Sequence, residues 1–181
     1  GIRHVRLYDV RPGAAAALAQ KWTAGCFPGE IQTCSSAEAC IRDADVISTC
    51  TSGDEQIIQK EWFKAGAFGI GIEGGCAYTA GALHQANKFI VDDVPLAEYF
   101  QKISLGRKNE RGEDNPEFPG GIPPVHSTIG DIVAGRRSPR DNAAERIIAI
   151  PIGMAICDIA LGDLVYQQAS RRGIGQAFAL A

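Results

Sequence analysis

The chain alternates short apolar runs with segments of helical character, and this alternation restricts its fold more than any other feature. The strand-like runs are rich in β-forming residues and include "HVRLYDV", "DVISTCT", "AFGIGIE" and "KFIVDD". Segments such as "PGAAAALAQKW" and "SSAEACIRDA" separate them and favour helix. Strands joined by single helices need right-handed crossovers and so form a parallel sheet. Near-continuous apolar runs are typical of strands covered on both faces. We therefore predict an α/β fold with a doubly wound, mostly parallel, Rossmann-like sheet.

Local signals place the helices. Ser35 stands three residues before Glu38, a capping-box spacing that predicts a helix over 35–44. A short helix is also predicted over 54–63, in "DEQIIQKEWF". The longest helix is predicted in "GMAICDIALGDLVYQQASRRG", where Gly173 ends it. Its apolar residues recur at helical spacing and form a wide face: Met154, Ile156, Ile159, Leu161, Leu164 and Val165.

The regular alternation stops after residue 104. The stretch 105–125 is rich in proline, glycine and charge and predicts a long loop. A helix over 127–135 that ends at Gly135 and a strand in "RIIAI" follow.

Composition excludes several classes of function. The 181 residues are 45% hydrophobic and 22% charged, as in ordinary globular proteins. A net charge of −3 gives no electrostatic reason to expect nucleic acid or an anionic membrane as partner. No apolar stretch approaches the ~20 residues that span a bilayer. The six cysteines are scattered, without C-x-x-C or histidine at ligand spacing. They predict free thiols in the cytoplasm and no metal site.

Ligands of doubly wound sheets bind outside the carboxyl ends of the strands. Asp9, followed by Val10 and Arg11, stands at the end of the first predicted strand. An acid at the end of the second strand of a dinucleotide fold accepts hydrogen bonds from the adenosine ribose and repels a 2′-phosphate. Taken alone, an aspartate before Arg-Pro is more often a turn or a helix cap.

Two further strand ends carry residues suited to a ligand. Thr49, Cys50 and Thr51 lie in "STCTSG", where small side chains let a ring or ribose approach the backbone, although a plain Ser/Thr-rich turn explains them equally well. In "GIGIEGGC" an apolar strand runs into one carboxylate and a pair of glycines. Either Glu73 points to water from a turn, or the stretch is the lip of a site where glycines permit close approach.

One motif is absent from the start of the chain. The spacing G-x-G-x-x-G occurs only in "GIGIEG" at 69–74, inside a later strand-like run, and no strand precedes "GIRHVRLYDV". If Asp9 ends a second strand, we expect the first strand and its phosphate-binding loop to lie upstream, so that the sheet is incomplete at its N-terminus.

The order of these motifs resembles the ornithine cyclodeaminase/mu-crystallin family along essentially the whole chain. "VRLYDVRP" resembles the family's second strand with its acid, and "ADVISTCTSG" its Ala-Asp…Thr-x-Thr motif. "KAGAFGIGIEGGC" resembles the segment that ends in Gly-Gly-Asp-Cys. "TIGDIVAGRRSPR" and "IPIGMAICDIALGDLVYQQASRRGIGQ" resemble the two helical segments that follow. The chain resembles the central and C-terminal part of a longer protein, without the family's N-terminal half.

The resemblance implies a Rossmann domain that binds NAD rather than NADP, inserted in a second domain that binds a small amino or imino acid and forms a homodimer. Residues 1–145 would then be a partial dinucleotide-binding domain, and residues 146–181 a strand and helix that belong to, or bridge to, the second domain. Asp9 would hold the ribose, and Thr49 and Thr51 would line the dinucleotide. Ile72, Glu73 and Gly74 would lie along its nicotinamide half. Pro151 stands where the family has a cofactor-contacting serine, and Ile152 where it has a valine beside the substrate.

The chain departs from the family at its catalytic acid. The aspartate of Gly-Gly-Asp-Cys aligns with Gly75, because Cys76 matches the cysteine that follows. Glu73 is two residues earlier and has one more methylene of reach, so it is our candidate proton carrier. The implied function is an NAD-dependent amino-acid dehydrogenase or imine reductase. The alternatives are an ornithine cyclodeaminase-type ammonia lyase and a non-catalytic, mu-crystallin-like protein that binds a dinucleotide or small ligand.

Overall fold

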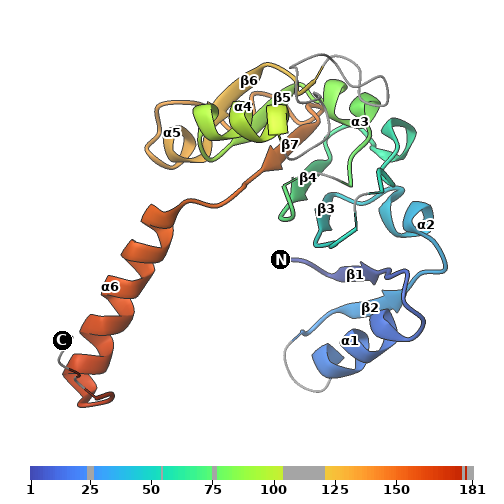
Figure 1. Cartoon of the computed structure of the whole chain (residues 1–181). Coiled ribbons are helices and arrows are strands. Elements are labelled where there is room, and N and C mark those ends of the chain that lie inside the picture. The colour runs from blue at the N-terminus through green and yellow to red at the C-terminus, as the bar shows by residue number, and fades with distance from the viewer. Residues whose placement is uncertain (24–26, 54, 75–76, 104–120, 177, 179–181) are drawn as a thin grey trace.

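The fold is given by a computed structural model, which describes residues 1–23, 27–53, 55–74, 77–103, 121–176 and 178. Every strand pair in the described residues is parallel. A two-stranded sheet contains β1 and β2, and a five-stranded sheet has the order β3-β4-β7-β5-β6 (Figure 1). The strands are β1 His4–Leu7, β2 Glu30–Thr33, β3 Val46–Thr49, β4 Phe68–Gly71, β5 Lys88–Val91, β6 Val125–Thr128 and β7 Ile147–Ile150. The predicted parallel α/β fold is confirmed.

Helices follow most strands, as the alternation predicts. They are α1 Ala14–Thr23, α2 Ala37–Ile41, α3 Ala80–His84, α4 Val94–Ile103, α5 Ile129–Val133 and α6 Ala155–Arg172, with a short 3₁₀ helix, η1, at Lys60–Trp62. Hydroxyl side chains start three of them: Ser36 caps α2, Thr79 caps α3 and Thr128 caps α5, each by accepting a backbone N–H.

The five-stranded sheet is covered on both faces, because successive residues of its strands point to opposite sides. In β7, Ile148 and Ile150 pack into a core that includes residues of α2, α3 and α4. Ile147 and Ala149 of the same strand pack on the other face, against residues of α5. All four residues of β7 are buried, which explains why "RIIAI" has no polar alternation.

Three sequence expectations are wrong in detail. Of the helix predicted over 54–63, the described residues 55–63 form only η1 at its end, and Ile58 pairs instead with Tyr78 in an isolated parallel bridge. The residue that caps α2 is Ser36, whose hydroxyl accepts from the Ala39 N–H, and not Ser35. β6 begins inside the stretch predicted as loop and helix. Most of the long loop predicted over 105–125, namely residues 105–120, lies outside the described residues.

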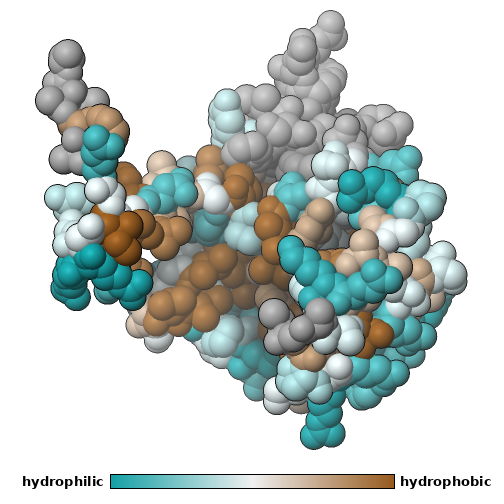
Figure 2. All heavy atoms as spheres, turned by 90° about the horizontal axis from the view of Figure 1, so that it is seen from below, coloured by the Kyte–Doolittle hydropathy of each residue, from teal (hydrophilic) through white to brown (hydrophobic). Residues whose placement is uncertain are grey.

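α6 leads away from both sheets (Figure 1). It ends where predicted, since Gly173 adopts the left-handed conformation and donates back to the last turn. The apolar face expected from the spacing is present and exposed: Ile156, Ile159, Leu161, Leu164 and Val165 are 54–71% accessible. Seen from below, apolar residues gather near the middle of the visible surface, with more hydrophilic residues around them (Figure 2). None of the described helices is long and apolar enough to cross a membrane.

Candidate functional site

The carboxyl ends of β3, β4, β7, β5 and β6 lie at one edge of the sheet, because all five strands run in the same direction. The register pairs Thr49 with Gly71 and Val91 with Ile150, the last residues of their strands. The Ile72 N–H also donates to the Thr49 carbonyl oxygen at 3.1 Å, so β3 and β4 stay together at the edge. The residues that follow these strand ends form the candidate site.

Glu73 does not point to water from a turn. Its carboxylate Oε1 accepts a hydrogen bond of 2.8 Å from the hydroxyl of Thr49, across from β4 to the end of β3. Thr49 is itself buried, and its Oγ1 also lies 3.4 Å from the Ile70 carbonyl oxygen. A hydroxyl has one proton to donate, and the contact with Glu73 is the shorter of the two. This hydrogen bond therefore fixes the direction of the half-buried Glu73 carboxylate at the sheet edge.

Tyr78 lies in the core beneath this pair. Its side chain is fully buried and its ring packs at a tilt on Phe63, with centroids 6.1 Å apart. Its hydroxyl forms no well-directed hydrogen bond with any described residue. Burial raises the pKa of the Tyr78 phenol, the nearby Thr49 hydroxyl partly offsets the rise, and the charges of Glu73 and Cys50 add to it. The phenol therefore stays neutral beside the Thr49–Glu73 pair.

We expect Tyr78→Phe to flatten the loss of stability at alkaline pH. The phenol titrates at 10.0 in the unfolded chain and at higher pH in the native protein. Above that pH the unfolded state loses the proton first, so the free energy of unfolding falls by up to about 1.4 kcal/mol per pH unit. Urea unfolding of parent and variant at about pH 8 and about pH 11 measures the difference. An equal alkaline loss in both proteins contradicts the assignment.

The other predicted residues at this edge differ in exposure. Ile72 and Cys50 are exposed, and Thr51 and Gly74 are half-buried. Gly74 has a φ of +86°, which L-residues rarely adopt, and a Cβ built there would meet nothing within 4 Å. The surface beside Gly74 is thus open. Gly75, the position that aligns with the family's aspartate, and Cys76 lie outside the described residues.

Pro151 and Ile152 follow β7, next to β4 in the sheet, and both are half-buried. The structure therefore brings Thr49, Glu73, Pro151 and Ile152 to one edge. Asp92, which follows β5, belongs to the same edge and was not predicted as a site residue. Neither was Tyr78. The acidic end of "KFIVDD" was a signal for Asp92, because it closes a strand as Asp9 does.

Asp9 lies after β1, in the separate two-stranded sheet. Its Oδ1 accepts from the backbone N–H of Arg11 at 2.8 Å and from the Arg11 Nε at 3.2 Å, and its Oδ2 accepts from Nη2 at 3.2 Å. These contacts lower the pKa of the Asp9 carboxyl and hold it ionised. No strand pairing in the described residues joins this sheet to the one that carries Glu73. Val10 beside it is 74% exposed.

The donor and acceptor set at Asp9 fits a ribose. A carboxylate offers about four lone-pair sites. The three hydrogen bonds from Arg11 use three of them, so one on Oδ2 remains for a hydroxyl. Ile72, beside Gly74, presents an apolar side chain that is 57% exposed.

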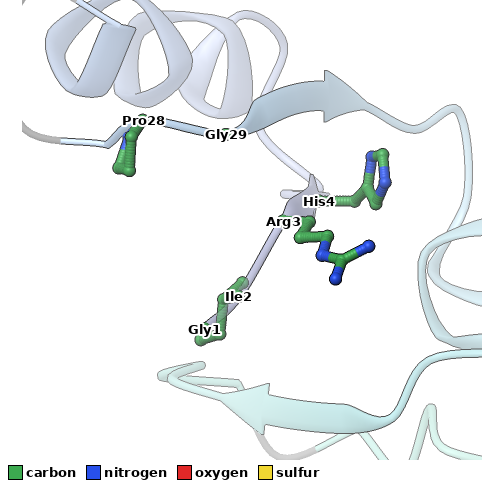
Figure 3. A pocket seen from close by; sticks show the side chains of 6 residues that line it. All are labelled: Gly1, Ile2, Arg3, His4, Pro28 and Gly29. Carbon is green, nitrogen blue, oxygen red and sulfur yellow. The ribbon is translucent and has the colours of Figure 1, made fainter.

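A separate hollow of about 460 Å³ lies around the start of β1. Its walls are Gly1, Ile2, Arg3, His4, Pro28 and Gly29 (Figure 3). It is at the opposite end of β1 from Asp9 and so does not belong to the edge that carries the predicted residues. Among the described residues no group of three or more His, Cys, Asp or Glu side chains is placed to hold a metal ion.

The fold and this edge define a doubly wound α/β protein with a polar site at the carboxyl ends of its strands. The model of the ornithine cyclodeaminase/mu-crystallin family matches residues 1–173. The chain belongs to this family, as its motifs indicate.

Characterised relatives match nearly all of the chain. It is 28% identical to the alanine dehydrogenase of Archaeoglobus fulgidus over 177 residues, which are 96% of this chain and 51% of that relative. An archaeal alanine dehydrogenase dimer solved with bound NAD superposes with a TM-score of 0.78 at 26% identity, over 99% of this chain and 53% of that one. The Thermococcus litoralis Δ1-pyrroline-2-carboxylate reductase, solved with NADH and L-proline, has the same fold: TM-score 0.76, 20% identity, 98% of this chain and 53% of that one. The chain spans about half the length of the relatives it matches.

Proposed function

We propose that the protein is an NAD-dependent oxidoreductase that acts on a small amino or imino acid, as an amino-acid dehydrogenase or imine reductase. The observation that carries the proposal is the Glu73 carboxylate, which Thr49 holds by a 2.8 Å hydrogen bond at the edge where Pro151 and Ile152 also lie. Dinucleotides bind at this edge of doubly wound sheets. Membership of the family and the likeness to an alanine dehydrogenase support it.

Each residue has a role that its position supports. NAD, when bound, accepts or donates the hydride at the α-carbon of the substrate. Asp9 accepts a hydrogen bond from the adenosine ribose and, with Val10 and Arg11, places that end of the cofactor. Thr49, Cys50, Thr51, Ile72, Gly74 and Pro151 shape the surface on which the nicotinamide half lies. Ile152 contacts the substrate, and Glu73 gives a proton to, or takes one from, the substrate nitrogen or an attacking water.

We further propose that residues 1–145 form a partial cofactor-binding domain and that residues 146–181, which begin with the central strand β7, bridge from it to a domain that binds substrate and forms a homodimer. The exposed apolar face of α6, on a helix that leads away from the sheets, supports such a connection (Figure 1). The archaeal alanine dehydrogenase of the same fold is a dimer. Cys34, Cys40, Cys50 and Cys157 are free thiols, which supports a reducing, cytoplasmic setting.

Cofactor-binding and substrate-turnover assays on the whole protein test the proposal. We expect fluorescence titrations to show that the protein binds NADH with higher affinity than NADPH. We expect absorbance at the NADH band to change with L-alanine and NAD⁺, or with Δ1-pyrroline-2-carboxylate and NADH. Binding without turnover on any amino or imino acid supports the non-catalytic alternative. Ammonia release from L-ornithine without net NADH supports the cyclodeaminase. The absence of dinucleotide binding contradicts the proposal.

A further inference from the structure

The pairing of β5 with β7 ends at a proline. The register joins Val91 to Ile150, the last residue of β7, and Pro151 follows. Proline has no backbone N–H, so the ladder of backbone hydrogen bonds cannot continue through it. The next two residues, Ile152 and Gly153, have N–H groups that need other acceptors.

The side chain of Asp92 supplies that acceptor. Asp92 follows Val91 on β5, and its Oδ2 accepts hydrogen bonds from the Ile152 N–H at 2.8 Å and the Gly153 N–H at 2.6 Å. Its Oδ1 accepts from the N–H of Asp93 at 3.0 Å, which fixes the plane of the carboxylate. Hydrogen bonds from backbone N–H groups to an ionised carboxylate are about twice as strong as neutral ones.

The same contact holds the root of α6. Gly153 has a φ of +97°, where the chain turns out of the sheet, and α6 begins at Ala155. Met154 precedes the helix without a side-chain cap. The direction in which the chain leaves β7 therefore depends on the N–H groups that Asp92 binds.

We propose that Asp92 is a positioning residue: its carboxylate fixes the Ile152–Gly153 backbone and so places Pro151 and Ile152 against cofactor and substrate. The proposal rests on the proposed function for the roles of Pro151 and Ile152. It predicts that loss of Asp92 impairs the chemical step and substrate binding more than the affinity for the dinucleotide, because Asp9 and Arg11 hold the other end of the cofactor from a separate sheet.

Asp92→Ala and Asp92→Asn in the whole protein test the proposal, with Asp93→Ala as the matched control. Asp93 is the adjacent carboxylate, but its Oδ1 caps α4 by accepting from the Leu96 N–H at 2.8 Å. Among the described residues the Ile152 N–H donates to Asp92 and not to Asp93. We expect kcat/KM to fall about a hundredfold in Asp92→Ala, the scale of an ångström-sized misplacement. Asp92→Asn keeps one acceptor oxygen and should retain an intermediate rate. The Kd for NADH should change less than about threefold in either variant.

Amide hydrogen exchange gives a readout that does not depend on turnover. In Asp92→Ala the amides of Ile152 and Gly153 should exchange faster, while those of β4 should not change. In Asp93→Ala the exchange of Ile152 and Gly153 and the value of kcat/KM should match the parent. Parental kcat/KM in Asp92→Ala, or an equal loss in the Asp93 control, overturns the proposal. Failure of the unsubstituted protein to bind NADH is a different result, which overturns the proposed function.

Discussion

Replacing Glu73 by glutamine is expected to lower turnover about a hundredfold or more, the scale of general acid–base catalysis. The amide keeps the shape of the side chain and can still accept the 2.8 Å hydrogen bond from Thr49. It cannot carry the proton that moves to or from the substrate nitrogen. The affinity for NADH should therefore change little, so that kcat falls while the Kd for NADH, measured by fluorescence, stays the same.

Two comparisons make the Glu73 test specific. Glu61→Gln removes a carboxylate from η1, where the side chain is 60% exposed, and should leave turnover unchanged. Thr49→Val removes the hydroxyl that directs Glu73 and should lower kcat by less than Glu73→Gln does, because the carboxylate remains. Near-normal turnover in Glu73→Gln would mean that the proton carrier is elsewhere in the protein.

Replacing Asp9 by serine is expected to shift cofactor preference from NADH towards NADPH by about ten- to a hundredfold in the ratio of affinities. In the parent protein the Asp9 carboxylate accepts three hydrogen bonds from Arg11. The substitution removes the negative charge that repels a 2′-phosphate. It also releases a guanidinium that is 79% exposed and suited to bind that phosphate.

The double variant Asp9→Ser/Arg11→Gln separates the two effects. If Arg11 takes the phosphate, the double variant loses the gain in NADPH affinity but keeps the weakened NADH binding. Fluorescence titration of both cofactors against the parent, single and double variants measures this. An unchanged NADH/NADPH ratio in the single variant contradicts the placement of the ribose at Asp9.

The elements of the fold were predictable where local chemistry and packing agree. β7 and β5 are buried on all four residues, and their sequences, apolar throughout in β7 and after Lys88 in β5, mark them as covered strands. Residues 54–63 have helix-forming composition, but Ile58 is buried and pairs with Tyr78, so tertiary contacts override the local preference. β6 was missed because "VHST" has little apolar character, and only its pairing with β5 makes it a strand.

The sequence allowed site residues to be predicted within each strand, but not the contacts between residues of different strands. The sequence indicated that Asp9, Thr49 and Glu73 end strands, because each follows an apolar run. It could not indicate that Thr49 donates to Glu73, since these residues are 24 positions apart and meet only through the register of β3 with β4. The link from Asp92 to Ile152 spans 60 positions and depends in the same way on β5 lying beside β7.

The place of β7 in the sheet has a consequence for how the protein folds. β7 is the last of the described strands in sequence order, yet it lies between β4 and β5, and it starts 56 residues after the end of β5. During synthesis the pairs β3–β4 and β5–β6 emerge first, each with an inner edge that has no partner until β7 arrives. Unpaired edges of this kind are open to pairing with other chains. Closing the sheet with its last strand brings distant segments together, which makes folding slow. The insertion of β7 between β4 and β5 is therefore the step at which folding and aggregation compete.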